Sequence, residues 1–192
     1  MKIIFWNVKG CNALDKRRLI KRGLDQLRPD VVFLQETKMD NGEEKSLLGS
    51  WKQWSRVFVD SEGASGGLGI LWNANIHKVE EGLASNMWQV CKLHSYPLNV
   101  DFTIINVYGP CKSELQKRFR RSLSSLIRDL EGRLLIIEGD FNAILELSEK
   151  LGGKGEIPTN LAHFQNFVTK NGLREIKSKE GQFTWSNRRI SG

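Results

Sequence analysis

The sequence is poor in the features that define several classes of protein. It has only three cysteines, Cys11, Cys91 and Cys111, which are widely spaced and belong to no paired motif. This pattern argues against a disulfide framework or a zinc site and favours a reducing compartment. No apolar run approaches the ~20 residues that span a bilayer, and the N-terminus reaches polar residues too soon for a signal peptide. We therefore expect an intracellular protein, in the nucleus or cytoplasm, with no membrane partner.

The composition is that of an ordinary globular chain with an excess of positive charge. The chain has 192 residues, of which 40% are hydrophobic and 27% charged, so we expect one domain over 1–192 with its own core. The net charge is +7, and basic residues cluster in 16–22 and 117–121. Such clusters can attract a phosphate-rich polymer. The alternative is that they are only the solvated faces of helices.

Hydrophobic periodicity predicts strands that alternate with helices, around a middle section rich in strands alone. The predicted strands cover 2–8, 30–35, 57–59, 66–72, 76–81, 87–93, 100–108, 134–138 and 183–185. The predicted helices cover 14–28, 113–131 and 159–171, and a glycine-rich surface loop is expected over 147–157. This order predicts an α/β fold, a four-layer sandwich of two mixed β-sheets flanked by helices.

Polar side chains follow four of the predicted strands at the point where each strand ends. The clearest case is the apolar run 134–137, which leads through Gly139 to Asp140 and Asn142. A carboxylate there can accept a proton or orient a water, and the amide can donate and accept hydrogen bonds. The other strand ends carry Asn7, Glu36 and Tyr108. The alternative for residues 139–142 alone is an Asx turn that simply closes a strand.

Side chains at strand ends converge in open α/β sheets, because the crevice lies beyond the strand ends. Several carboxylates and amides together make a reasonable site for one hard divalent cation and a phosphate. Mg²⁺ takes oxygen ligands, keeps several waters and is held by only one or two carboxylates plus substrate oxygens. We therefore expect Mg²⁺ as the cofactor, with Mn²⁺ as a possible substitute.

Six short motifs, in order along the chain, resemble those of the endonuclease/exonuclease/phosphatase superfamily. They are Trp6-Asn7-Val8-Lys9-Gly10, Leu34-Gln35-Glu36-Thr37, 66–72, Asn106-Val107-Tyr108-Gly109-Pro110, Gly139-Asp140-Phe141-Asn142 and 182–187. Together they are most similar to the apurinic-type endonuclease domain of plant non-LTR (LINE-type) retrotransposons. The resemblance runs from residue 2 to about residue 189.

The resemblance implies a role for each strand-end residue. Glu36 would ligate Mg²⁺, with Asn7 beside it in the same polar cluster. Asp140 would orient and deprotonate the attacking water, supported by Asn142, and Tyr108 would contact the scissile phosphate.

The last motif implies contacts with the substrate. Trp185 would lie at the DNA-binding rim, against the sugar or a displaced base, and Asn187 would also bind substrate. The alternatives are a core aromatic residue for Trp185 and a strand-end surface tyrosine for Tyr108.

Two departures from the family pattern bear on activity. Lys9 stands where some repair-enzyme relatives carry an acidic residue. The family pattern ends with an acidic strand motif and a Ser-Asp-His triplet, and this sequence reaches Gly192 before either. We expect His77, His94 and His163 to be ordinary histidines that do not replace the missing one. We therefore expect a truncated copy of a retrotransposon endonuclease that lacks the closing strands and has little or no activity.

Three functions therefore remain open. The first is a Mg²⁺-dependent DNA endonuclease by lineage, inactive or very weak as given. The second is a non-catalytic, retrotransposon-derived remnant that binds nucleic acid, and the third is a small-molecule phosphatase of the same superfamily. The basic charge favours the two functions that involve nucleic acid, and we expect a monomer that binds DNA independently of its sequence.

Overall fold

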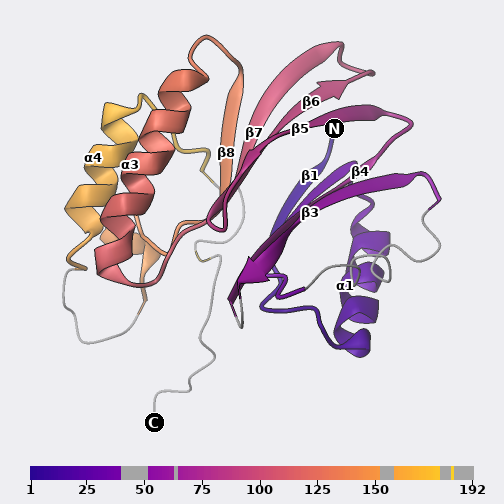
Figure 1. The fold of residues 1–192 in the computed structure, drawn as a ribbon, viewed down its shortest axis with the longest axis horizontal. Coiled ribbons are helices and arrows are strands. Elements are labelled where there is room, and N and C mark those ends of the chain that lie inside the picture. Colours follow the sequence, from indigo (N-terminus) through magenta and orange to yellow (C-terminus); the bar gives the residue numbers. More distant parts are fainter. Residues whose placement is uncertain (40–51, 63–64, 152–157, 178–182, 184–192) are drawn as a thin grey trace. The chain divides into compact units, whose positions relative to one another are not determined.

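The computed structural model describes residues 1–39, 52–62, 65–151, 158–177 and 183. The chain divides into two compact units. The first unit comprises residues 1–110 and 130–141, and the second comprises 111–129 and 142–192. All the strands and the helix α1 described below belong to the first unit, and α3, η1 and α4 belong to the second (Figure 1).

The first sheet has the strand order β1-β2-β4-β3. Its strands are β1 (Ile3–Asn7), β2 (Val31–Gln35), β3 (Trp54–Glu62) and β4 (Ser65–Asn73). β1 and β2 are parallel, whereas β4 is antiparallel to both β2 and β3, so the sheet is mixed. The parallel pair brings the carboxyl ends of β1 and β2 together at one edge of the sheet.

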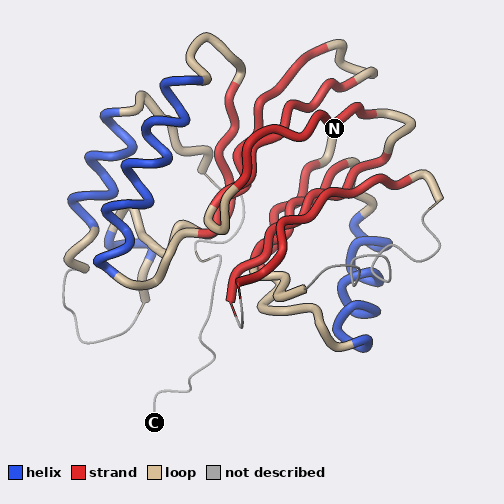
Figure 2. Tube along the Cα trace, viewed as in Figure 1, coloured by secondary structure: helices blue, strands red, loops and turns tan. Residues whose placement is uncertain are grey.

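The second sheet has the order β5-β6-β7-β8. Its strands are β5 (His77–Ala84), β6 (Trp88–Ser95), β7 (Val100–Tyr108) and β8 (Leu135–Asp140). The first three form an antiparallel meander, and β8 pairs in parallel with β7. Figure 2 shows the two sheets of the first unit lying face to face. Here too the parallel pair brings two carboxyl ends together.

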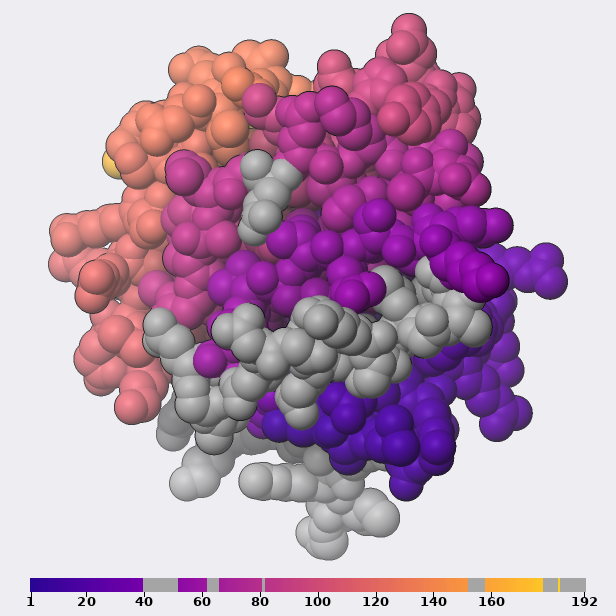
Figure 3. All heavy atoms as spheres, turned by 45° about the vertical axis from the view of Figure 1, so that its right-hand side comes forward, coloured from indigo at the N-terminus to yellow at the C-terminus, as the bar shows by residue number. Residues whose placement is uncertain are grey.

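Alternating side chains of β2 supply both faces of the first sheet. Val31 and Phe33 pack toward the second sheet, against a cluster that includes Leu93 and Ile104. Val32 and Leu34 face the other way and pack with Ile20 and Leu24 of α1 (Leu14–Leu27). Because β2 is buried on both faces, it is continuously apolar, as is typical of a strand within a sandwich. In the space-filling view, the indigo N-terminal region adjoins the purple strand region on one face (Figure 3).

The second unit contains α3 (Ser113–Asp129), the short 3₁₀ helix η1 (Leu147–Glu149) and α4 (Leu161–Lys170). The buried residues of α3 include Phe119, Leu123 and Leu126, and those of α4 are Leu161, Phe164 and Phe167. The named residues of α3 recur at intervals of four and three and those of α4 at intervals of three, which places each set on one side of its helix. α4 is followed by Gly172, whose positive φ of 62° is typical of a residue that terminates a helix.

The predicted α/β class and the two mixed sheets are confirmed. The structure lengthens β3 to nine residues and extends β8 to Asp140, and it places η1 within the predicted loop. Leu19 is 64% exposed, so the buried side of α1 is narrower than its apolar pattern indicates. The predicted strand 183–185 lies outside the described residues except for Phe183. No helix among the described residues is long and apolar enough to cross a membrane.

Candidate active site

The carboxyl ends of β1 and β8 meet through one hydrogen bond between the two sheets. The Asn7 Nδ2 atom donates to the Asp140 Oδ2 atom at 2.9 Å, across 133 positions of sequence. Backbone pairing places Asn7 beside Gln35 and Tyr108 beside Asp140. The predicted residues Asn7, Glu36, Tyr108 and Asp140 therefore lie at the same end of the sandwich in the first unit.

The side chain of Asn7 is fixed by a second hydrogen bond. Its Oδ1 atom accepts a hydrogen bond from the Lys9 backbone N–H at 3.0 Å. This hydrogen bond orients the Asn7 amide group. Its oxygen faces the Lys9 N–H, so its nitrogen faces the Asp140 carboxylate. The amide therefore acts as an oriented donor toward Asp140.

Glu36 follows β2 in a conformation that few residues other than glycine adopt. Its φ is 54°, and that of Lys38 is also 54°. Backbone hydrogen bonds hold the turn, since the Gly10 N–H donates to the Glu36 carbonyl at 2.6 Å and the Thr37 N–H donates to the Gly67 carbonyl at 3.1 Å. A left-handed backbone costs on the order of 1–3 kcal/mol at a non-glycine residue and persists where surrounding contacts over-determine it. The turn fixes the direction in which the Glu36 side chain leaves the strand.

The Glu36 carboxylate is mostly buried and already faces a positive charge. Its Oε1 atom lies 3.1 Å from the Lys38 ammonium, and the two side chains are 18% and 33% exposed. The ammonium occupies a position beside the carboxylate that a metal cation could take instead.

A buried polar pair lies behind these residues. The Gln35 Nε2 atom donates to the Asn106 Oδ1 atom at 2.6 Å, and the Asn106 amide nitrogen donates to the Leu34 carbonyl at 3.1 Å. Gln35 is 1% exposed and Asn106 is fully buried. These bonds tie β2 to β7 directly beneath the strand ends, so they fix the two sheets relative to each other at the site.

Gly139 gives β8 the backbone conformation that precedes Asp140. Its φ is 139°, and a Cβ atom there would collide with the backbone carbonyl oxygen of Val107. The Gly109 N–H donates to the Asp140 carbonyl at 2.6 Å. A glycine is therefore needed for β8 to approach β7 closely enough to present Asp140.

A third carboxylate at these strand ends, Glu138, was not predicted as a site residue. Ile136 packs in the core between the sheets, and side chains two apart on a strand share a face. Glu138 and Asp140 therefore both point toward the first sheet. Although the residue keeps exposed surface, burial of the carboxyl raises its pKa, opposed by a hydrogen bond from the Gly139 backbone. The strand alternation of Ile136, Glu138 and Asp140 was the signal available in the sequence.

The roles predicted for Asn142, Trp185 and Asn187 remain predictions. Asn142 belongs to the second unit and adopts a left-handed φ of 47°. Trp185 and Asn187 lie outside the described residues.

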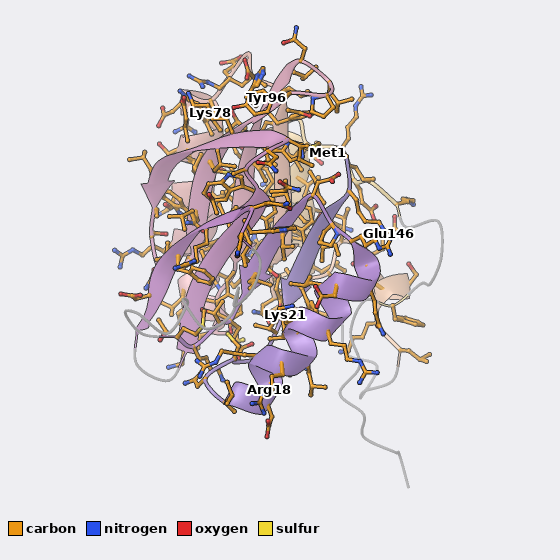
Figure 4. All side chains as sticks on the ribbon, turned by 90° about the vertical axis from the view of Figure 1, so that its right-hand side faces the viewer. Met1, Arg18, Lys21, Lys78, Tyr96 and Glu146 are labelled. Carbon is orange, nitrogen blue, oxygen red and sulfur yellow. The ribbon has the colours of Figure 1, made fainter. Side chains whose placement is uncertain are left out.

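The two histidines of the first unit lie at the opposite end of the second sheet. His94 pairs with Asp101 in the ladder, and its Nδ1 atom is 2.7 Å from the Asp101 carboxylate. Asp101 precedes Tyr108 by seven residues on β7, or roughly 23 Å at about 3.3 Å per residue. His77 lies on β5 beside Ser95. Figure 4 marks this end of the sheet with Lys78 and Tyr96.

The donor set fits a hard cation better than a transition metal. Among the described residues there is no group of three or more His, Cys, Asp or Glu side chains that could hold a metal ion. Glu36 and Asn7 offer a carboxylate and an amide oxygen. The adjacent Lys38 ammonium is further evidence that Glu36 accommodates a cation. A pair of oxygen ligands completed by water and substrate oxygens is the arrangement that suits Mg²⁺.

Comparison with protein families assigns the chain. Residues 4–174 match the model of the Endonuclease/Exonuclease/phosphatase family. The chain belongs to this family. Membership places it among nuclease- and phosphodiesterase-type hydrolases, which are generally dependent on divalent metals. A comparison with curated protein sequences found no match.

Solved structures of the family share the fold at low sequence identity. The endonuclease domain of TRAS1, a telomere-specific non-LTR retrotransposon, has a TM-score of 0.70 at 13% identity, covering 94% of this chain and 76% of that one. The AP endonuclease LMAP from Leishmania major has a TM-score of 0.69 at 19% identity, covering 88% and 66%. The 3′ phosphatase NExo from Neisseria, bound to a product DNA hairpin, has a TM-score of 0.69 at 20% identity, covering 88% and 70%.

Proposed function

We propose that the chain is a Mg²⁺-dependent phosphodiesterase that acts on DNA, with a site whose own residues support only slow cleavage. The observation that carries the proposal is the hydrogen bond from Asn7 to Asp140, which joins the carboxyl ends of the two sheets at 2.9 Å. The bond brings Asn7, a candidate metal ligand, together with Asp140, the candidate base. Mn²⁺ has the same preference for oxygen ligands and is proposed to substitute.

Asp140 is the proposed base. Its carboxylate would accept a proton from the attacking water, and the Asn7 amide would hold it in orientation by donating to the Oδ2 atom. Asn142 would support this orientation, and Tyr108, which pairs with Asp140 in the ladder, would contact the scissile phosphate.

Glu36 and the Asn7 amide oxygen would hold the cation. A bound Mg²⁺ polarises a phosphoryl oxygen and stabilises the charge that develops on the leaving oxygen. For Glu36 to bind the cation, the Lys38 side chain must leave its carboxylate, and the partly exposed position of that lysine allows it to turn toward solvent or a substrate phosphate. Trp185 and Asn187 are proposed to contact the substrate beside this centre.

The expected rate is low because no histidine of the first unit lies at the cluster. Preorganised donors aimed at developing charge are a large catalytic term, and loss of one such donor costs on the order of 10²–10³ in rate. His94 is bound to Asp101 at the far end of the sheet, and His77 lies on that end as well.

The resemblance of the fold to DNA-processing proteins supports DNA as the proposed substrate. The fold resembles the endonuclease domain of a non-LTR retrotransposon, and NExo is a relative bound to a DNA hairpin. The net charge of +7 is consistent with binding that is independent of sequence. We propose that the chain acts as a monomer, in the nucleus or cytoplasm where DNA is present.

A second candidate is a non-catalytic protein that binds nucleic acid. The placement of His77 and His94 away from the cluster favours it, because neither histidine of the first unit can then donate to the charge on the phosphate.

A plasmid-nicking assay distinguishes the two candidates. We expect slow conversion of supercoiled to nicked plasmid in Mg²⁺, lost on chelation and lost in Asp140→Ala. The matched control is Asp101→Ala, which removes a carboxylate from the far end of the same sheet and should leave nicking unchanged. Equal nicking by the native chain and Asp140→Ala would overturn the proposal. DNA binding without any metal-dependent nicking would support the second candidate instead.

A further inference from the structure

The second unit contains a groove between its two long helices. α3 and α4 lie side by side (Figure 1), and the Asn171 Nδ2 atom at the end of α4 donates to the Ser124 Oγ atom of α3 at 3.0 Å. Residues from Ser113 to Arg128 and from Thr159 to Lys170 line a groove of about 650 Å³. Because the two helices run in the same direction along it, both N-termini lie at one end.

The lining of this groove is strongly basic. It contains five lysine and arginine side chains against one carboxylate, that of Glu114. The basic residues are Lys117, Arg120, Arg121, Arg128 and Lys170. The first four recur at intervals of three, four and seven along α3, which places them on one side of that helix, and Lys170 is the last residue of α4. None of the five forms an ion pair with a residue that the structure describes.

The N-terminus of α4 adds to the positive potential at one end. No acidic residue lies in its first turn, and its N-cap residue Asn160 forms no side-chain capping hydrogen bond. A helix N-terminus carries a partial positive charge and favours anions. The basic side chains of the groove and the N-terminus of α4 therefore both favour the binding of an anion.

We propose that this groove binds the phosphate backbone of double-stranded DNA, at a site separate from the candidate active site. The proposal rests on the proposed function only for its choice of DNA as the polyanion. Lys117 and Arg128 are eleven residues apart, about 16 Å along a helix at 1.5 Å per residue. That length covers about five base pairs at 3.4 Å each.

The neutral side chains of the groove favour backbone contact over base recognition. Ser113, Ser124 and Thr159 offer hydroxyl groups, the kind of donor that positions phosphates without reading sequence. The lining has no exposed Phe, Tyr or Trp ring, because Phe167 is buried, and its one exposed ring is the His163 imidazole. Single-strand binding depends on exposed aromatic rings on which bases stack. The lining therefore suits a duplex better than a single strand.

The test is the binding of a fluorescent duplex of about 20 base pairs, measured by anisotropy in EDTA at several salt concentrations. We compare Lys117→Glu/Arg121→Glu with Lys112→Glu/Arg118→Glu. Both pairs change the net charge equally, but only the first lies in the groove, since Lys112 and Arg118 do not line it. We expect the groove variant to weaken binding at least tenfold. Its slope of log affinity against log salt should become shallower by about 0.9 for each phosphate that the protein no longer neutralises, while the control pair stays near the native slope.

Each alternative outcome has a definite meaning. Equal weakening by both pairs would overturn the groove and assign binding to net charge. Tighter, groove-dependent binding of single-stranded DNA would overturn the duplex assignment, and equal groove-dependent binding of poly-glutamate would overturn the assignment to nucleic acid. Circular dichroism of every variant checks that the helices persist. Since EDTA removes metal, binding that survives while plasmid nicking fails would reject the catalytic proposal and leave the groove intact.

Discussion

The Gln35 side chain donates a hydrogen bond to Asn106 at 2.6 Å in the interior of the sandwich, from β2 of one sheet to β7 of the other. Both residues are almost fully excluded from solvent. A buried polar group that loses its partner pays the full cost of desolvation.

We therefore predict that Asn106→Ala lowers the free energy of unfolding by about 2–4 kcal/mol, since it leaves both the Gln35 amide and the Leu34 carbonyl without this partner. Urea denaturation measures the change. The control is Gln35→Leu/Asn106→Leu, which removes both polar groups and should recover part of the loss. A single variant as stable as the native chain would show that the pair contributes nothing.

Glu36→Ala should weaken Mg²⁺ or Mn²⁺ binding, because it removes the proposed carboxylate ligand. Titration calorimetry measures the affinity, and we expect a loss of at least tenfold. Glu80→Ala is the matched control, since Glu80 also pairs with a lysine, Lys78 at 2.7 Å, but on the exposed surface. Asp140→Asn should barely change the affinity if its function is to orient water. Unchanged binding in Glu36→Ala would rule out this ligand assignment.

Lys38→Met should have the opposite effect on the same titration. Its ammonium lies 3.1 Å from the Glu36 carboxylate and competes with a cation for it. Removing the competitor should raise metal affinity by a few fold. A drop in affinity would mean that Lys38 holds Glu36 in its binding position.

Gly139→Ala should destabilise the protein more than Gly132→Ala does. Both glycines have positive φ, 139° and 80°, but a Cβ atom at Gly139 meets the Val107 backbone, whereas one at Gly132 meets nothing within 4 Å. Gly132→Ala should cost only the conformational strain, about 1–2 kcal/mol. Gly139→Ala should cost more than about 3 kcal/mol because the backbone must also shift. Equal thermal midpoints for the two variants would contradict the close approach of β8 to β7.

Stability should fall as the pH drops because of His77. Burial lowers the pKa of this imidazole below its usual 6.5, with Asp30 acting in the opposite direction. The folded state therefore binds the proton less well than the unfolded state, so stability is complete above about pH 6.5 and is lost as the pH falls through the lower folded value. His77→Leu should flatten the unfolding free energy between pH 7 and 5. An unchanged slope would assign the dependence to other groups.

The sequence predicted the four strands that build the site, although not their pairing, because the signals of the individual strands are local. Continuous apolar runs that end in Asn7, Glu36 and Asp140 identify buried strands and the polar residues that follow them. β3 was predicted at only three residues because its length depends on its pairing with β4. The ring of Phe58 lies over Gly69 of β4, where any side chain on Gly69 would collide with it. A single strand's own sequence does not contain that information.

The Asn7–Asp140 and Gln35–Asn106 hydrogen bonds also could not be predicted from the sequence, since they join residues 133 and 71 positions apart. Glu138 was overlooked for a different reason. The alternation of Ile136, Glu138 and Asp140 puts Glu138 on the same face as Asp140, but the sequence does not show that this face lies toward the first sheet. The groove of the second unit depends on how α3 and α4 lie together, although the basic stripe of α3 was already visible.

The hydrogen bond from Asn7 to Asp140 makes the geometry of the candidate site sensitive to the spacing between the two sheets. Its donor belongs to one sheet and its acceptor to the other, so the spacing between the sheets sets the distance between them. Cys91 and Ile104 lie in the layer that determines this spacing. Larger or smaller side chains at these two positions would change the alignment of Asp140 from the interior, with no change at Asn7 or Asp140 themselves.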